Sequence, residues 1–208
     1  MQLLANTTSP FVRIARVALL EKGFDIEPTV VDPWADDARL RAANSATRVP
    51  TLVLEDGTAL TECLLIVQWL EAARPGPQWP GLLGSDAGQA AGVLSRAGLA
   101  VGAIEASTIT IITRKVTAPV LFDETPVGLR RRRSMVEGML RLEAVAGELA
   151  ADASVAPTLD VICAVTLWDY QQLRHGGQPW LPATPRLQAL AQGWRTRPSF
   201  ARSMPRAA

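Results

Sequence analysis

The sequence is poor in the residues that build metal centres, disulfide frameworks and tyrosine-based chemistry. Its 208 residues include two cysteines, one histidine and one tyrosine. Cys63 and Cys163 lie far apart and lack CxxC spacing, so we expect neither a disulfide scaffold nor a zinc site. Such sparing use of cysteine is typical of a reducing compartment. We therefore expect a cytoplasmic protein that holds no metal.

The chain also lacks an excess of charge and a long apolar run. It carries 21 Lys and Arg against 20 Asp and Glu, a formal net charge of +1. Nucleic acids and anionic membranes both favour a basic excess, and no apolar stretch approaches the roughly 18 residues of a membrane span. Met1 to Ala5 is too short for a signal core and is predicted to be a strand. We expect neither nucleic acid nor a membrane as a partner.

The basic run at residues 130–133 does not change that expectation. Consecutive helical residues point in all directions around the axis, so these four arginines cannot form one stripe. The run predicts a solvated helix face.

The sequence does contain a first helix with clear start and stop signals. Ser9 suits the N-cap, Pro10 the first helical position and Gly23 the position just past the end. Between them, apolar residues recur at helical spacing, at Phe11, Ile14, Ala15, Ala18 and Leu19.

The elements around this helix follow the order of a thioredoxin-like fold. Strands are predicted at residues 1–5, 28–32 and 51–54, and the turn at 55–58 leads into a short closing strand at 59–60. A weak helix is expected at 35–43, and a last one after Thr61, which can cap it. The order is strand, helix, strand, helix, hairpin, helix.

Proline and glycine at residues 75–84 interrupt the pattern and predict a linker. Beyond it, only helical segments are expected, at residues 86–115, 126–151, 158–174 and 185–197. We therefore predict an α/β domain over residues 1–74, with a thioredoxin-like fold, and an all-helical C-terminal domain over residues 85–208.

Several separated motifs resemble the glutathione S-transferase superfamily, in its bacterial members with a serine at the active site. They are Ser9-Pro10-Phe11-Val12-Arg13, Arg48-Val49-Pro50-Thr51-Leu52, Asp56-Gly57, Leu60-Thr61-Glu62-Cys63, Trp69-Leu70-Glu71 and Arg197-Pro198-Ser199-Phe200-Ala201. Each motif alone is weak, but their order and spacing match over nearly the whole chain.

The resemblance implies that Ser9 is the catalytic group. Glutathione attacks as a thiolate, whereas a free thiol with a pKa near 8.5 is mostly protonated at neutral pH. A hydroxyl at a helix N-terminus, beside Phe11, can stabilise that thiolate. Thr7 and Thr8 are alternative hydroxyls, and Ser9 as a helix cap alone is the structural alternative. Tyrosine chemistry is excluded from the first domain, because the only tyrosine is Tyr170.

The resemblance also implies the glutathione contacts. A cis Val49–Pro50 peptide would present the backbone of Val49 to the cysteinyl part of glutathione. Glu62 would receive the γ-glutamyl amine and Arg48 the glycine carboxylate, opposite charges in each case. Trp34 would border the glutathione or electrophile pocket, or would be an aromatic residue with a packing role only.

Cys63 departs from the family pattern, which has Ser or Thr at this position to help hold the γ-glutamyl carboxylate. A thiol is a poorer donor than a hydroxyl, so glutathione affinity is open. Cys63 is interpreted as a small buried residue, although its place at a helix N-terminus would lower a thiol pKa.

Two residues of the second domain are interpreted as structural. Asp160 resembles a buried capping acid. His175, at a helix end, is predicted to be a C-terminal cation or cap. An apolar set on the long helix could line an electrophile pocket or form core: Ala103, Ile104, Ser107, Thr108 and Ile111.

The predicted function is therefore conjugation of glutathione, as co-substrate, to a small hydrophobic electrophile, as in detoxification. A glutathione-dependent isomerase or dehalogenase is one alternative, and a non-catalytic ligand- or partner-binding protein is the other. The resemblance further implies a homodimer.

Overall fold

The computed structural model describes residues 1–119 and 121–205, and Val120 and residues 206–208 lie outside it. The chain forms two compact units. One comprises Met1–Leu82 together with the chain after Thr196, and the other is Leu83–Thr196. The first unit has a thioredoxin-like fold and the second is helical, so the predicted fold class is confirmed.

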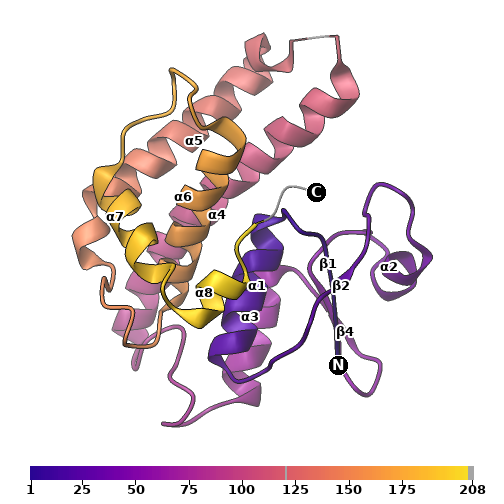
Figure 1. Cartoon of the computed structure of the whole chain (residues 1–208), viewed down its shortest axis with the longest axis vertical. Coiled ribbons are helices and arrows are strands. Elements are labelled where there is room, and N and C mark those ends of the chain that lie inside the picture. Colours follow the sequence, from indigo (N-terminus) through magenta and orange to yellow (C-terminus); the bar gives the residue numbers. More distant parts are fainter. Residues whose placement is uncertain (120, 206–208) are drawn as a thin grey trace. The chain divides into compact units, whose positions relative to one another are not determined.

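The first unit is built on a four-stranded sheet with the order β2-β1-β3-β4. Its strands are β1 (Gln2–Ala5), β2 (Thr29–Val30), β3 (Thr51–Val53) and β4 (Ala59–Thr61). β1 and β2 run parallel, and the β1–β3 and β3–β4 pairs are antiparallel. Its helices α1 (Pro10–Glu21) and α3 (Cys63–Ala73) pack against each other (Figure 1).

Local capping fixes α1 as the sequence predicts. The Ser9 hydroxyl oxygen accepts a hydrogen bond from the Val12 N–H at 3.3 Å, and Pro10 opens the helix. Gly23 follows the helix with φ +74°, and a Cβ there would come within 2.0 Å of the Trp79 ring. Glycine is required here both for the backbone conformation and for the close contact with Trp79.

A buried lysine fastens the segment that follows α3 to α1. Lys22, with 1% of its side chain exposed, forms an ion pair with Glu71 at 2.8 Å. Its ammonium also donates to the carbonyls of Arg74 and Trp79, at 3.3 Å each. Glu71 in turn accepts from the Leu82 N–H at 3.0 Å. A charge buried in this way is tolerated because its donors are paired.

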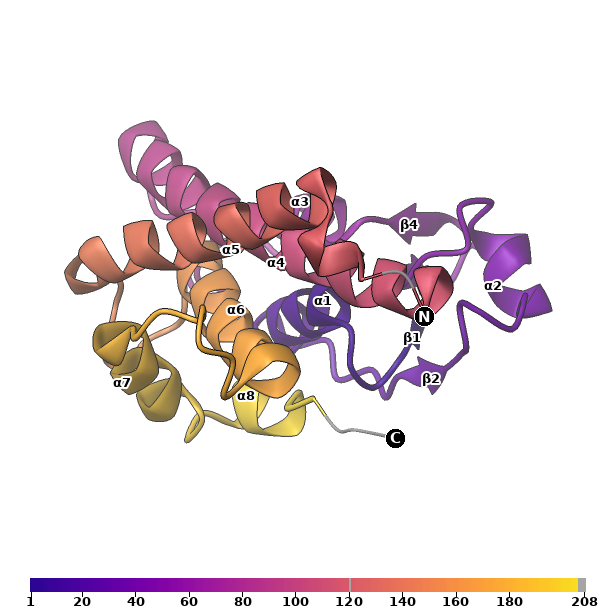
Figure 2. The same ribbon diagram turned by 90° about the horizontal axis from the view of Figure 1, so that it is seen from above.

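The helix α8 (Pro198–Arg202) also belongs to the first unit and packs on α1 (Figure 2). Arg197 donates two hydrogen bonds of 2.7 Å to Glu21, and the Ser199 hydroxyl donates to the same carboxylate. The sequence-based division at residue 85 does not include this return of the chain to the first unit.

The second unit consists of α4 (Ala87–Thr117), α5 (Pro126–Ala144), α6 (Leu159–His175) and α7 (Pro185–Trp194), with the short 3₁₀ turns η1 (Phe122–Glu124) and η2 (Ala146–Glu148). α4 packs against both α5 and α6 (Figure 1). Ala103, Ile104 and Ser107 are buried within it. Gly138 of α5 lies so close to Ala103 that a Cβ there would approach to 2.8 Å.

Asp160 is buried at the start of α6, as predicted. It forms an ion pair with Arg96 of α4 at 2.7 Å and accepts from the Val161 N–H at 3.0 Å. This carboxylate therefore joins two helices of the unit.

Several element boundaries differ from the prediction, among them those of α2 (Ala38–Ala43), α5 and α3. α2 begins later than residue 35, because the Asp37 carboxylate caps it by accepting from the Arg39 and Leu40 N–H groups. α5 ends at Ala144 rather than residue 151. Thr61 ends β4 and does not cap α3, whose N-cap is Glu62.

No helix of the described residues is long and apolar enough to cross a membrane.

Candidate functional site

The register of the sheet gathers the predicted site residues at one end. Leu4 of β1 pairs with Thr51 of β3, and Thr51 pairs with Thr61 of β4. The chain leaving β1, the chain entering β3 and the chain leaving β4 therefore meet at one edge, at strand spacings of about 4.8 Å. These three segments carry the Ser9, Val49 and Glu62 motifs.

Ser9 presents a hydroxyl with an unused proton at the start of α1. The Asn6 side-chain oxygen accepts the Ser9 N–H at 2.8 Å and holds the turn. The Ser9 oxygen accepts from Val12, and no described residue accepts its hydroxyl proton. The Phe11 N–H has no acceptor among the described residues either. The helix start therefore offers two donors and a positive potential.

A cavity of about 200 Å³ adjoins Ser9 within the first unit. Thr7 and Ser9 lie on its wall, together with Val12, Arg13 and Arg16 of α1. Its other lining residues are Ala5, Asn6, Glu27, Pro28, Val30, Arg202, Ser203, Met204 and Pro205.

The loop before β3 contains the predicted cis peptide, between Val49 and Pro50. The Arg48 carbonyl accepts from the Asn44 side-chain amide at 3.0 Å and from the Thr51 hydroxyl at 2.9 Å. Asn44 is buried and donates to Thr51 as well, at 3.1 Å. Asn44 thus holds this loop in place, a role the sequence analysis did not identify.

Glu62 links β4 to α3 in a strained conformation. Its φ of +63° lies in the left-handed region, which residues with a Cβ rarely adopt. Its carboxylate forms an ion pair with Arg48, and both side chains are exposed. The two residues predicted to bind opposite charges of glutathione are therefore each other's partners in this structure.

Cys63, the first residue of α3, is 4% exposed. Burial, reinforced by the charge of Glu62, raises the pKa of its thiol to about 12. The expectation that the helix N-terminus would lower this pKa is wrong, because loss of hydration outweighs the helix dipole. Cys63 is a neutral buried thiol, as its interpretation as a small buried residue predicted.

Trp34 lies in the turn between β2 and α2 with 61% of its surface exposed. Its N–H donates to the Asp32 carboxylate at 2.9 Å. It does not line the cavity beside Ser9.

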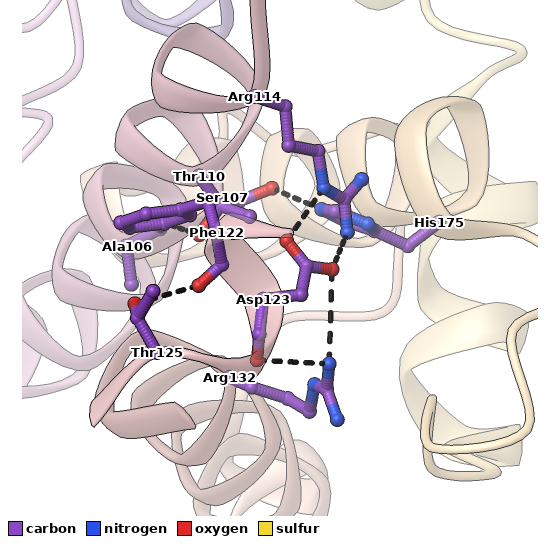
Figure 3. Close-up of polar contacts among 9 residues, drawn as sticks. All are labelled: Ala106, Ser107, Thr110, Arg114, Phe122, Asp123, Thr125, Arg132 and His175. Carbon is purple, nitrogen blue, oxygen red and sulfur yellow. Dashed lines mark hydrogen bonds and ion pairs between the residues drawn. The ribbon is translucent and has the colours of Figure 1, made fainter. Parts of the chain in front are cut away.

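A separate polar cluster lies inside the helical unit (Figure 3). His175 is 1% exposed, and its Nε2 lies 2.9 Å from the Ser107 hydroxyl. Burial, together with the positive charge of Arg114, lowers the pKa of His175 to about 4. The predicted C-terminal cation is therefore wrong, and the imidazole is neutral at pH 7.

Two arginines near His175 share one carboxylate. Arg114 forms an ion pair with Asp123 of η1, and Arg132 of α5 lies 3.7 Å from the same carboxylate (Figure 3). The described residues contain no group of three or more His, Cys, Asp or Glu side chains placed to hold a metal ion.

Comparison with known proteins gives a consistent result. Residues 3–78 match the family model of the glutathione S-transferase N-terminal domain. The chain is 29% identical over 207 residues to the uncharacterised GST-like protein YibF of Escherichia coli, covering 99% of this chain and 98% of that one. It is 40% identical over 62 residues to a probable maleylacetoacetate isomerase of Caenorhabditis elegans, covering 29% of this chain and 28% of the relative.

Among solved structures, a glutathione S-transferase of Methylobacterium radiotolerans in complex with glutathione sulfonate superposes with a TM-score of 0.87. The two sequences are 28% identical, and the match covers 100% of this chain and 95% of that one. The fold, the matched domain and the full-length likeness lead to one conclusion: residues 3–78 form a glutathione S-transferase N-terminal domain, and the chain as a whole is similar to proteins of the glutathione S-transferase superfamily.

Proposed function

We propose that the protein conjugates glutathione to a small electrophile, with Ser9 stabilising the glutathione thiolate. The observation that carries this proposal is the Ser9 hydroxyl. It accepts from Val12 and still has a proton to donate, at a helix N-terminus that lies on a cavity. A hydroxyl has one donor and two acceptor positions, so capping and thiolate binding are compatible.

The chemical step is a displacement at carbon. The bound thiol releases its proton to solvent, and the thiolate attacks the electrophilic carbon. A C–S bond forms as the bond to the leaving group breaks, and the leaving group departs with the electron pair. Ser9 and the Phe11 N–H stabilise the sulfur anion before attack, so their contribution is a lowered thiol pKa.

Backbone and charged groups at the same end of the sheet are proposed to hold the tripeptide. The N–H and C=O of Val49 have no partner among the described residues, and they would pair with the cysteinyl unit. Glu62 would take the γ-glutamyl amine and Arg48 the glycine carboxylate. Since these two side chains now pair with each other and are exposed, exchanging that pair for ligand contacts costs little, about 0–1 kcal/mol.

Cys63 would contribute through its backbone N–H at the start of α3, because its neutral buried thiol is a weak donor. Trp34 stays a candidate for the outer border of the glutathione site. Homodimer formation also stays a prediction.

An isomerase is the second candidate function. The relative named as a probable maleylacetoacetate isomerase matches 62 residues. Such a reaction would use the same thiolate and return glutathione unchanged, so glutathione consumption separates the two functions.

Turnover of an activated aryl halide with glutathione tests the proposal. Ser9→Gly removes the hydroxyl but keeps a residue that caps helices almost as well as serine, so α1 should remain stable. We expect kcat/KM to fall about 10- to 100-fold in Ser9→Gly, because each lost pKa unit of thiol activation is worth 1.36 kcal/mol. Ser9→Thr, the matched control, should retain most activity. Equal turnover in Ser9→Gly and the wild type would rule out the role of Ser9.

A further inference from the structure

The turn that leads into α1 is held by the side chain of Asn6. Its Oδ1 accepts the N–H of Ser9 at 2.8 Å, a short bond for this type of donor and acceptor. Among the described residues, no backbone-to-backbone hydrogen bond joins two residues within 6–9. The side chain of Asn6 is therefore the hydrogen-bond partner that fixes the shape of this turn.

The sequence of α1 explains why an acceptor is needed here. A helix capped by serine commonly uses a Glu or Gln at its third residue to accept the N–H of that serine. In α1 the third residue is Val12, whose side chain has no acceptor. Asn6 takes over this task from the chain that precedes the helix.

The hydrogen bonds at Ser9 differ in length. Asn6 accepts at 2.8 Å, whereas the capping bond from the Val12 N–H to the Ser9 hydroxyl oxygen measures 3.3 Å. The capping bond is longer than most bonds of its type, so it is weak. The place of Ser9 therefore depends mainly on its backbone, whose N–H is bound to Asn6 and whose carbonyl accepts from the Arg13 N–H at 3.1 Å.

Asn6 itself follows directly on a buried strand. β1 ends at Ala5, and residues 3–5 are at most 1% exposed. The Ala5 carbonyl accepts from the Val31 N–H at 2.9 Å, which continues the pairing of β1 with β2. The Asn6 side chain thus joins Ser9 to a strand whose position is set by the core of the unit.

We propose that Asn6 is a positioning residue: by fixing the backbone of Ser9, it aims the Ser9 hydroxyl at the sulfur of bound glutathione. A hydrogen bond weakens steeply as its angle departs from linearity, so a displaced hydroxyl stabilises the thiolate less. The inference rests on the proposed function, because Asn6 acts only through the hydroxyl of Ser9.

The pKa of the bound glutathione thiol tests this role, measured in the full chain from thiolate absorbance as the pH is varied. Asn6→Leu removes the acceptor at nearly constant side-chain size. It should raise the thiol pKa by about half a unit or more, part of the roughly one to two units expected from a hydrogen bond to a charged group. Asn6→Ala also lacks an acceptor and replaces this variant if Asn6→Leu does not fold.

The conservative variant is Asn6→Ser. A serine can accept the N–H three residues further along the chain, as Ser9 does for Val12. Asn6→Ser should therefore restore a thiol pKa close to that of the wild type. If Asn6 had a merely structural role, Asn6→Leu would lower the free energy of unfolding and would not move the thiol pKa of the folded protein.

A double variant separates positioning from direct contact with the sulfur. Ser9→Gly keeps the N–H that Asn6 accepts, but it has no hydroxyl to aim. Adding Asn6→Leu to Ser9→Gly should therefore leave the thiol pKa unchanged, the coupling expected of two residues that act through one group. A further rise in the double variant would overturn the positioning role, because Asn6 would then act on the sulfur itself.

The contact between Asn6 and Ser9 is measured in the free protein by amide hydrogen exchange. The Ser9 N–H should exchange slowly in the wild type and in Asn6→Ser, and faster in Asn6→Leu. Equal exchange in the three proteins would overturn the inference alone, and so would a thiol pKa that Ser9→Gly raises and Asn6→Leu does not. If Ser9→Gly itself leaves the thiol pKa unchanged, the proposed role of Ser9 is wrong, and the inference is wrong with it.

Discussion

Two helices begin at the same end of the sheet and carry different chemistry. α1 starts after Ser9, a half-buried residue whose hydroxyl caps the helix and which adjoins a cavity. α3 starts at Cys63, a thiol that is 4% exposed, behind an N-cap residue that makes no side-chain cap. Both positions experience a positive helix potential. Of the two side chains, only that of Ser9 is accessible enough to be a candidate donor to a ligand anion.

The difference shows that hydration outweighs the helix dipole. A dipole contributes about 0.3–1 kcal/mol, whereas burial shifts a pKa by up to 3–5 units at 1.36 kcal/mol each. At the C-terminal end of α6, burial again outweighs the helix dipole, here for a group that would be a cation. A helix C-terminus favours a cation, yet burial holds the pKa of His175 at about 4.

The largest expected effect is on the reactivity of Cys63. With a pKa near 12 instead of 9.0, its thiolate fraction at pH 8 falls about a thousandfold. We expect native Cys63 to be alkylated by iodoacetamide at least that much more slowly than in the urea-unfolded chain. Peptide mass spectrometry separates it from Cys163, which is also buried. Fast native labelling of Cys63 would break the contrast with Ser9.

The lowered pKa of His175 predicts that the stability of the folded protein depends on pH. Its folded pKa of about 4 lies below the unfolded value of 6.5, so the unfolded chain binds more protons between these values. The contribution of neutral His175 to the free energy of unfolding is therefore fully present above pH 6.5. It is lost as the pH drops toward 4, by on the order of 3 kcal/mol. Urea unfolding at several pH values measures this.

The matched control is His175→Gln. Asp123 does not obscure the comparison, because its ion pair with Arg114 lowers its carboxyl pKa and it titrates below this window. The difference in stability between wild type and variant should shrink on acidification from pH 6.5 to 4. A constant difference would mean that His175 is not held neutral.

The smallest expected effect concerns glutathione affinity at α3. Cys63→Ser installs the hydroxyl of the family pattern and should tighten glutathione binding a few-fold, the scale of one neutral hydrogen bond. Cys63→Ala should leave the dissociation constant unchanged, since the present thiol donates little. Calorimetric titration distinguishes the two. A marked loss of affinity in Cys63→Ala would show that the thiol does contribute.

Local signals made the first helix predictable. Ser9, Pro10 and Gly23 act on adjacent backbone groups, so sequence alone indicates where α1 begins and ends. The position of α8, in contrast, is not set by residues adjacent to it in the sequence. This helix is fastened to α1 by the pair between Glu21 and Arg197, which are far apart in the chain. Pairings at long range leave no periodic signal in the sequence.

The same distinction applies to the site. Motif order predicted the cis peptide at Pro50. Motifs did not indicate that Asn44 holds the loop, because its partners are a carbonyl and a hydroxyl brought near only by folding. The expectations of a lowered pKa for the Cys63 thiol and of a cationic His175 were wrong for a related reason. Position on a helix is visible in sequence, but burial is a property of the tertiary structure.

The most direct test of the central proposal is the pKa of the glutathione thiol bound to the protein. Ultraviolet absorbance of the thiolate, titrated against pH, measures it in the wild type, Ser9→Thr and Ser9→Gly. A hydrogen bond to a charged group is worth about 1.5–3 kcal/mol, which corresponds to about one to two pKa units. The bound thiol should therefore titrate well below 8.5 in the wild type and Ser9→Thr, and at least about one unit higher in Ser9→Gly. The same pKa in all three proteins would contradict the assignment of Ser9.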